Sequence, residues 1–203
     1  MRKKLQVFIS STFADLVAER QAAVEAILKA GHIPAGIGIE PFFMESPMET
    51  IKRWIDESDV YILILGGIYG TMLPDESKSY THWEYDYAGE LGKPRFALVL
   101  TDEALRQKPY DFVVVADYQK FQEFKQSAME EVPIFHIEEE WHVRWVIHEK
   151  LKEYKGRDDL DGWVSGKDFP DVQKLLEENA SLLRENAKLH AVLKKTLPDT
   201  SHR

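Results

Sequence analysis

The chain has 203 residues, 44% hydrophobic and 11% aromatic, which allows one sizeable core with an appended segment but not two complete enzyme domains. Its formal net charge of -9 argues against nucleic acid and anionic membrane surfaces as partners. It contains no cysteine, which excludes disulfides and thiolate chemistry. Its longest apolar run, residues 60–65, is too short to cross a membrane. From these two features we expect a cytoplasmic protein.

The first part of the chain alternates between strand-like and helix-like segments. Residues 5–9 have the β-branched and aromatic content of a strand. Thr12 followed by Asp15 is typical of a capping box, and the helix that it predicts ends at Gly31. A short second strand is expected over residues 33–39. These segments form a first strand-helix-strand unit.

The next segments continue the alternation. Residues 46–49, Ser-Pro-Met-Glu, combine an N-cap serine with a proline at the first helical position and so predict a helix start. Residues 60–65 are uninterruptedly apolar, which indicates a strand buried on both faces of a parallel sheet. Ser79 can cap a helix over residues 80–91, and residues 95–100 predict a fourth strand.

Beyond residue 100 the pattern is less regular. Residues 112–115 fit a strand or a loop, residues 118–129 a helix and residues 133–137 a last strand. A closing helix over residues 138–155 is expected to pack on the sheet through one stripe of side chains. The stripe consists of Trp141, Trp145, His148 and Leu151. Residues 1–155 therefore predict a three-layer, doubly wound α/β domain, flavodoxin-like or TIR-like, with a parallel sheet of about five strands.

The remaining residues predict a coiled coil. Residues 156–170 are rich in Gly, Asp and Lys and are typical of a linker, and residues 198–203 form a tail. Between them, residues 171–197 carry a seam with alternating spacings of three and four. The seam consists of Val172, Leu175, Asn179, Leu182, Asn186, Leu189 and Leu193. Two asparagines at a positions favour a parallel homodimer; the alternative is a single amphipathic helix folded back on the domain.

A ligand site is expected where the order of the strands reverses, at their carboxyl ends. Ser10-Ser11-Thr12 follows the first strand and residues 66–70 follow the third, so both turns flank this point. Hydroxyls and amides of the first turn suit a phosphate or ribose oxygen of a nucleotide-like small molecule. Gly66 and Gly67 allow a backbone to approach such a ligand closely. The same residues also fit ordinary capping and turn composition.

Glu84 is the candidate catalytic residue. It lies in the second turn of the helix that follows the third strand, so it can reach the same crevice. When a glycosidic bond to a good leaving group such as nicotinamide breaks, positive charge develops on the ribose, and a carboxylate can stabilise it. Phe43, Tyr69 or Trp83 can supply an aromatic face for the base. The alternative is a solvated glutamate on an acidic helix.

Other catalytic machinery is missing from the sequence. It contains neither a GxxxxGK[ST] loop nor a GxGxxG turn after a strand. HExxH is also absent, and His136, His142 and His148 lack the spacing of metal ligands. We therefore expect neither a metal site nor a required cofactor.

Three blocks of the chain resemble a TIR-like domain family described as of unknown function. The first runs Val-Phe-Ile-Ser-Ser-Thr-Phe over residues 7–13, with Asp-Leu and Glu-Arg pairs shortly after it. Ile68-Tyr69-Gly70 is the second block and residues 79–88 are the third, with Gly92-Lys93-Pro94 following in the family's place. The resemblance covers residues 5–150.

The resemblance implies a function in signalling or prokaryotic defence. Many TIR domains of similar fold cleave NAD at the nicotinamide glycosidic bond, and their catalytic glutamate follows an aromatic-Cys-x-x-Glu pattern. Tyr80-Thr81-His82-Trp83-Glu84 resembles this pattern with threonine in place of cysteine, and Ser79 lies one position nearer the glutamate than in those domains. The resemblance thus implies NAD as a substrate and Glu84 as the catalytic residue.

Three hypotheses follow. The first is an NAD-processing enzyme, a hydrolase or cyclase, that self-association switches on. The second is a non-catalytic TIR-like module that assembles through the coiled coil, as a dimer or larger assembly, and binds a protein partner. The third is an enzyme resembling nucleoside ribosyltransferases, which would use a similarly placed carboxylate.

Overall fold

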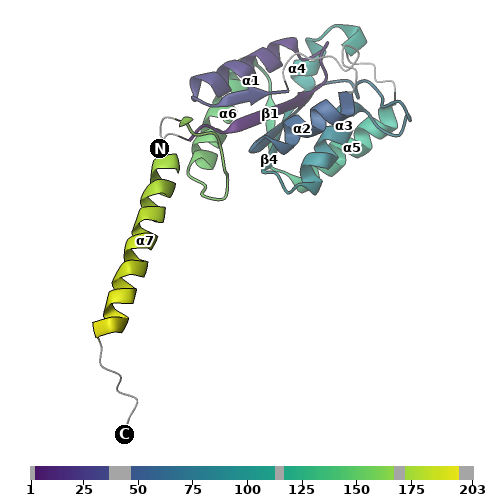
Figure 1. Ribbon diagram of the computed structural model, residues 1–203. Coiled ribbons are helices and arrows are strands. Elements are labelled where there is room, and N and C mark those ends of the chain that lie inside the picture. The colour runs from purple at the N-terminus through teal and green to yellow at the C-terminus, as the bar shows by residue number, and fades with distance from the viewer. Residues whose placement is uncertain (1–2, 37–46, 113–116, 167–171, 197–203) are drawn as a thin grey trace. The chain divides into compact units, whose positions relative to one another are not determined.

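A computed structural model of the chain describes residues 3–36, 47–112, 117–166 and 172–196 (Figure 1). The chain divides into a compact unit of residues 3–163 and a C-terminal unit that contains helix α7 (Val172–Thr196). Within the described residues, none of the helices combines the length and the apolar character that crossing a membrane requires.

Five parallel strands form the central sheet, in the order β2-β1-β3-β4-β5. The strands are β1 (Gln6–Ser11), β2 (Ile33–Ala35), β3 (Val60–Leu65), β4 (Arg95–Leu100) and β5 (Ile134–Ile137). This is the strand order of flavodoxin-like doubly wound sheets, and it reverses between β1 and β3. The predicted α/β fold with a five-stranded parallel sheet is therefore confirmed.

Helices cover both faces of the sheet (Figure 1). One face is covered by α1 (Val17–Lys29), α4 (Asp102–Arg106) and α6 (Glu140–Lys155), and a short 3-10 turn spans Tyr110–Phe112. The other face is covered by α2 (Pro47–Asp56), α3 (Tyr80–Glu90) and α5 (Tyr118–Glu131). Alternate residues of each strand enter the two cores, because successive side chains of a strand point to opposite faces.

Helix α1 begins later than the sequence predicts. The Thr12 hydroxyl donates a hydrogen bond to the Asp15 carboxylate over 2.5 Å, within the turn that precedes the helix. The predicted capping box is wrong because these two side chains bond to each other, and the N-cap residue is Leu16. Ser79, by contrast, caps α3 as predicted and accepts a hydrogen bond from the His82 amide at 3.2 Å.

Helix α6 buries a different face from the predicted stripe. Trp141 and Trp145 are 53% and 58% exposed, and of the predicted stripe only Leu151 is buried. The helix packs against α1 and the sheet through aliphatic side chains next to that stripe, among them Val143 and Ile147. The prediction was wrong because both stripes have helical spacing, and the smaller aliphatic side chains allow the closer approach of two helices.

The compact unit extends beyond the predicted domain end at residue 155. Trp163 pairs with Lys4 in an antiparallel bridge, with backbone hydrogen bonds of 2.6 and 2.8 Å. The Gly162 amide donates to the Asp59 carboxylate at 2.8 Å. The first half of the predicted linker is thus part of the folded unit. Of the predicted strands and caps, residues 37–39, Ser46 and residues 113–115 lie outside the described residues.

Helix α7 confirms the C-terminal helix predicted over residues 171–197. Leu175, Leu182 and Leu189 of the predicted seam are each about half exposed, and Asn179 and Asn186 are exposed as well. The side chains of Val172 and Leu193 lie outside the described part of the chain. The coiled coil itself stays a prediction.

The two faces of α6 predict different responses to truncation. We expect Leu151→Ala to lower the free energy of unfolding by about 2–5 kcal/mol, because this side chain is fully buried in the α1–α6 layer. Trp145→Ala on the exposed face is the matched control and should cost less than about 1 kcal/mol. Urea unfolding of both variants measures the difference. A larger loss for Trp145→Ala would show that the indole face carries the packing.

Candidate functional site

A pocket lies beside the carboxyl end of β1, next to the point where the strand order reverses. Its volume of about 450 Å³ is within the usual range of sites for small ligands. It is lined by the turn after β1, the loop after β3, the start of α3, and parts of α1 and α2. Ser11, Thr12, Tyr69 and Glu84 of the predicted site line it. A pocket thus lies at the edge of the sheet where the strand order predicts a ligand site.

Glu84 is held in this pocket by the first strand. The Ser10 hydroxyl, 1% exposed, donates a hydrogen bond of 2.5 Å to Glu84 Oε2. Burial raises the pKa of Glu84 to about 7, although the Ser10 hydrogen bond and the positive charge of Arg20 act in the opposite direction. Both protonation states are thus available to Glu84 near neutral pH. Glu84 is partly exposed to the pocket and is bonded to β1, so it does not lie on the freely solvated face of α3.

The loop after β3 closes over the end of β1 because Gly70 permits it. Gly70 has a φ of +95°, a conformation that other residues rarely adopt, and a Cβ there would lie 2.9 Å from Thr12 Cγ2. Tyr69, just before it, becomes part of the pocket wall. The backbone conformation at Gly70 thus brings the second of the three sequence blocks against the first.

Gly66 and Gly67 serve packing and do not line the pocket. A Cβ at Gly66 would lie 2.4 Å from Asp15 Oδ2, and one at Gly67 would lie 2.2 Å from the Phe112 carbonyl oxygen. The space that both glycines leave is therefore filled by the protein itself. Their predicted role in ligand binding is corrected accordingly: they let the loop after β3 pack closely on the neighbouring segments.

The aromatic lining differs from the prediction. Trp83 is absent from the pocket wall and stacks on Tyr87, with ring centroids 5.8 Å apart. Consecutive helical residues point about 100° apart, and here Trp83 packs on Tyr87, one turn further along α3, while Glu84 faces the pocket. Trp54 of α2 and Tyr80 at the start of α3 line the pocket in its place. Phe43 lies outside the described residues.

Arg20 is a functional candidate that the sequence analysis missed. Its Nη1 donates to Ser11 Oγ at 2.6 Å, and its Nη2 donates to the Gly36 carbonyl oxygen at 3.0 Å. The guanidinium carbon lies 5.7 Å from the centroid of the Phe13 ring. Burial lowers the pKa of Arg20, and the charge of Glu84 opposes this shift. The available signal was its place in the helix that follows the Ser-Ser-Thr turn.

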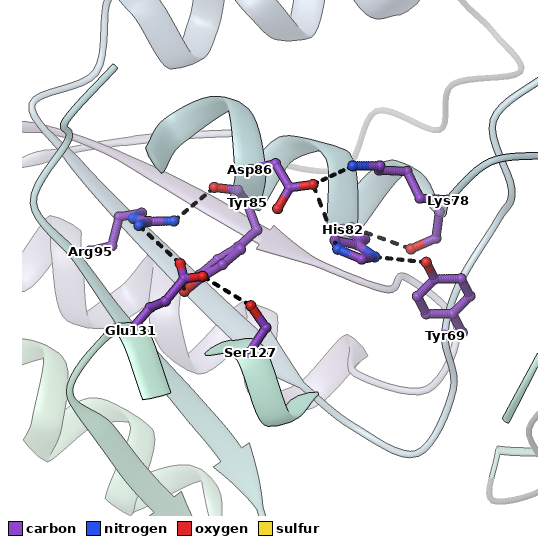
Figure 2. A network of polar contacts seen from close by, with 9 residues as sticks. Tyr69, Lys78, His82, Tyr85, Asp86, Arg95, Ser127 and Glu131 are labelled. Carbon is purple, nitrogen blue, oxygen red and sulfur yellow. Dashed lines mark hydrogen bonds and ion pairs between the residues drawn. The ribbon is translucent and has the colours of Figure 1, made fainter. Parts of the chain in front are cut away.

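Polar contacts at the start of α3 hold Tyr69 in the pocket wall (Figure 2). The Tyr69 hydroxyl and His82 Nδ1 are 2.8 Å apart, and His82 Nε2 lies 3.6 Å from the Asp86 carboxylate. Lys78 approaches the same carboxylate to 2.5 Å. The His82 ring also stacks on Phe124 of α5 at 4.2 Å. This part of α3 is thereby held against its neighbours.

A second group of contacts holds the middle of α3 (Figure 2). The Tyr85 hydroxyl donates to the Glu131 carboxylate at 3.1 Å, and the Arg95 guanidinium lies 3.4 Å from it. Arg95 also donates to the Tyr85 carbonyl oxygen at 3.0 Å. Since Glu84 directly precedes Tyr85, these contacts determine where its carboxylate lies.

Within the described residues, no group of three or more histidine, aspartate or glutamate side chains is placed to bind a metal ion.

Comparisons with known proteins place the pocket within a family domain. The family described as "Domain of unknown function (DUF4062)" matches residues 6–153. No curated protein matches the chain. A solved structure of similar fold is titled "Structure of Clostridium botulinum CMP N-glycosidase, BcmB"; it has 17% sequence identity and a TM-score of 0.43, and the match covers 73% of this chain and 98% of that one. All the residues that line the pocket lie within residues 6–153.

Replacement of Glu84 by glutamine should stabilise the protein at pH 8 and not at pH 4. Because the pKa of Glu84 rises from 4.5 to about 7 on folding, the folded protein keeps a proton that the unfolded chain loses. The free energy of unfolding therefore falls as pH rises from 4.5 to about 7, and Glu84→Gln escapes this loss. We expect Glu84→Gln to raise the free energy of unfolding by about 1–3 kcal/mol at pH 8. This range already allows for the partial exposure of Glu84, which weakens the effect.

Urea unfolding at both pH values checks this expectation. Glu90→Gln, at the exposed end of the same helix, is the matched control for the loss of one carboxylate from α3. A wild-type protein as stable as Glu84→Gln at pH 8 would contradict the raised pKa.

Proposed function

The chain belongs to the DUF4062 family, whose function is unknown, and we propose that it cleaves the N-glycosidic bond of a nucleotide with Glu84 as its catalytic carboxylate. The observation that carries this proposal is the Ser10–Glu84 pair, a desolvated carboxylate at the wall of a pocket that adjoins the strand-order reversal. Such a carboxylate suits the stabilisation of a ribosyl cation.

We propose NAD as the substrate. All three blocks that resemble the TIR-like family meet at the pocket: the first contributes Ser11, the second Tyr69 and the third Glu84. Ser10 of the first block holds Glu84 from behind the pocket wall. In the proposed reaction the bond between C1′ of the ribose and the nicotinamide nitrogen breaks, and its electron pair leaves with neutral nicotinamide. The oxygen of a water molecule bonds to C1′, and one proton is released. The products are nicotinamide and ADP-ribose.

Individual residues have defined roles in this reaction. The ionised Glu84 carboxylate stabilises positive charge at C1′, and the Ser10 hydrogen bond holds it in position. Trp54 and Tyr80 provide aromatic faces for the base. The Ser11 hydroxyl donates to the Thr12 carbonyl oxygen and can still accept a hydrogen bond from a ribose hydroxyl, whereas the Thr12 hydroxyl is held by Asp15. A ribosyltransferase would use the same carboxylate with a second base as acceptor in place of water.

Glu84→Gln should lower the rate of nicotinamide release by about 10²–10³-fold, because a neutral amide cannot stabilise the ribosyl cation. The test incubates concentrated full-length protein with NAD and follows free nicotinamide by chromatography. Glu90→Gln controls for a loss of charge on the same helix. Release that Glu84→Gln leaves unchanged, or none from clustered wild-type protein, would refute the proposal of NAD cleavage.

The pH profile gives a second measurement on the same samples. The wild-type rate should rise with pH through about 7, because the ionised form of Glu84 is the active one. A rate that is constant from pH 5 to pH 9 would assign the chemistry to another group.

A second candidate function is a TIR-like module that assembles without catalysis. The observation that favours it is α7, whose exposed leucines and asparagines follow the seven-residue spacing of a two-stranded coiled coil. We propose that α7 pairs in parallel with α7 of a second copy, and that the resulting dimer activates the enzyme or nucleates a larger assembly with a protein partner in the cytoplasm.

Leu182→Lys should convert this dimer into a monomer, because it places a charge at the centre of the seam. Ser181→Lys adds the same charge to the adjacent, exposed position outside the seam and should leave the dimer intact. Light scattering gives the mass of each protein, and a chain without residues 171–203 provides the monomeric reference. Identical masses for wild-type protein and this truncated chain, after correction for length, would exclude the coiled coil.

A further inference from the structure

The contacts of Arg20 indicate which chemical group of the substrate lies beside the ribose, and the position of Glu84 alone does not indicate this group. We infer that Arg20 binds a phosphate group of the substrate, so that the pocket takes nucleotides in preference to nucleosides. This inference rests on the proposed function, because it assigns the group that lies next to the ribose held at Glu84. It concerns binding, and it can be tested whether or not the bond is cleaved.

The Arg20 guanidinium is held rigidly before any ligand arrives. Ser11 Oγ and the Gly36 carbonyl oxygen accept its hydrogen bonds at 2.6 and 3.0 Å, and the Phe13 ring lies beside it. Gly36 has a φ of +75°, and a Cβ there would lie 2.8 Å from the Ile9 carbonyl oxygen, so glycine is required for the backbone to approach β1 this closely. A preorganised arginine loses little side-chain entropy when it binds an anion.

Counted over the described residues, the guanidinium has donors left for a ligand. Arginine has five N–H groups, and the described residues accept hydrogen bonds from one on Nη1 and one on Nη2. The planar arrangement of the others suits the oxygens of a phosphate, to which arginine binds in a bidentate manner. Since Arg20 lines the pocket, a ligand there can reach these donors.

The charge of Arg20 is not balanced by an ion pair within the described residues. No carboxylate there lies within 4.0 Å of its nitrogens. Glu84 acts on it only as a more distant charge, and that carboxylate is partly protonated at neutral pH because its pKa is about 7. A partly buried guanidinium without a paired carboxylate favours an anionic ligand, since the ligand supplies the missing charge.

Arg20 and Glu84 come from different elements, α1 and α3, and contact the last two residues of β1. Arg20 bonds to Ser11, and Glu84 bonds to the adjacent residue, Ser10. A ligand that spans the two sites has its phosphate at one end and its sugar carbon C1′ at the other. This is the arrangement of a ribose that carries a phosphate on its 5′ carbon, as in a nucleotide.

The experiment uses three ligands that share one glycosidic bond and one leaving group: nicotinamide riboside, nicotinamide mononucleotide and NAD. Calorimetry on full-length Glu84→Gln, in which cleavage is expected to be about 10²–10³-fold slower, measures their affinities. We expect the mononucleotide and NAD to bind about 10- to 100-fold more tightly than the riboside. Equal binding of NAD and the mononucleotide identifies a single phosphate as the ligand group, and tighter binding of NAD shows that its second phosphate or its adenosine adds contacts.

Added substitutions assign the preference to Arg20. Arg20→Gln should reduce the preference to less than about threefold, and Arg20→Lys, which keeps the charge but lacks the planar fork, should retain part of it. Arg106→Gln, at an exposed position outside the pocket, is the matched control. If Arg20→Gln fails to fold, as judged by circular dichroism, the lysine variant and the three-ligand comparison decide the question.

The results distinguish failure of this inference from failure of the proposed function. Equal affinity for the riboside and the mononucleotide, or a preference that Arg20→Gln leaves intact, overturns the inference even if NAD is cleaved. A phosphate preference that depends on Arg20 upholds it even if no nicotinamide is released. In an active enzyme, Arg20→Gln should also shift the pH profile to higher pH, because the charge of Arg20 lowers the pKa of Glu84. A merely structural role of Arg20 would not produce the ligand preference.

Discussion

The hydrogen bond between Ser10 and Glu84 joins the two elements on which the rest of the pocket depends. Ser10 lies near the end of β1, where the strand is fully enclosed, and Glu84 comes from α3, which covers the face of the sheet. A parallel sheet brings the carboxyl ends of β1 and β3 to one edge, and its order reverses between them. The helix after β3 therefore returns beside the end of β1, and a carboxylate in its second turn meets the strand.

This arrangement is unfavourable for stability and useful for chemistry. Burial disfavours the charged form of Glu84. The Ser10 hydroxyl and the more distant Arg20 guanidinium offset this cost only in part. The contacts on either side of Glu84 keep α3 in place despite that cost. Tyr85 is held by Arg95 and Glu131, and His82 is held by Tyr69 and Phe124. A carboxylate that is destabilised locally and held by its surroundings is typical of functional sites.

The first turn of the domain serves the core and the pocket at the same time. Its buried residue Thr12 bonds to Asp15 inside the domain, and Ser11 faces Arg20 at the pocket. Gly66 and Gly67 allow the next loop to pack against this region, and Gly70 allows it to turn over Thr12. The sequence block that resembles TIR-like domains therefore combines residues that build the edge of the sheet with residues that a ligand would contact.

The sequence by itself determined the α/β fold and the order of the elements, and it predicted which edge of the sheet has the pocket and that Glu84 lies there. These follow from local periodicity and from the general geometry of parallel sheets. It could not decide between faces with the same helical spacing, so Trp83 and the indole stripe of α6 were placed wrongly. It showed Arg20 only as part of a Glu-Arg pair with no role of its own, and it gave no reason to select Trp54 or to assign Gly66 to packing. Only the tertiary structure decided these points, because each depends on a contact between segments far apart in the chain, and local propensity contains no information about such contacts.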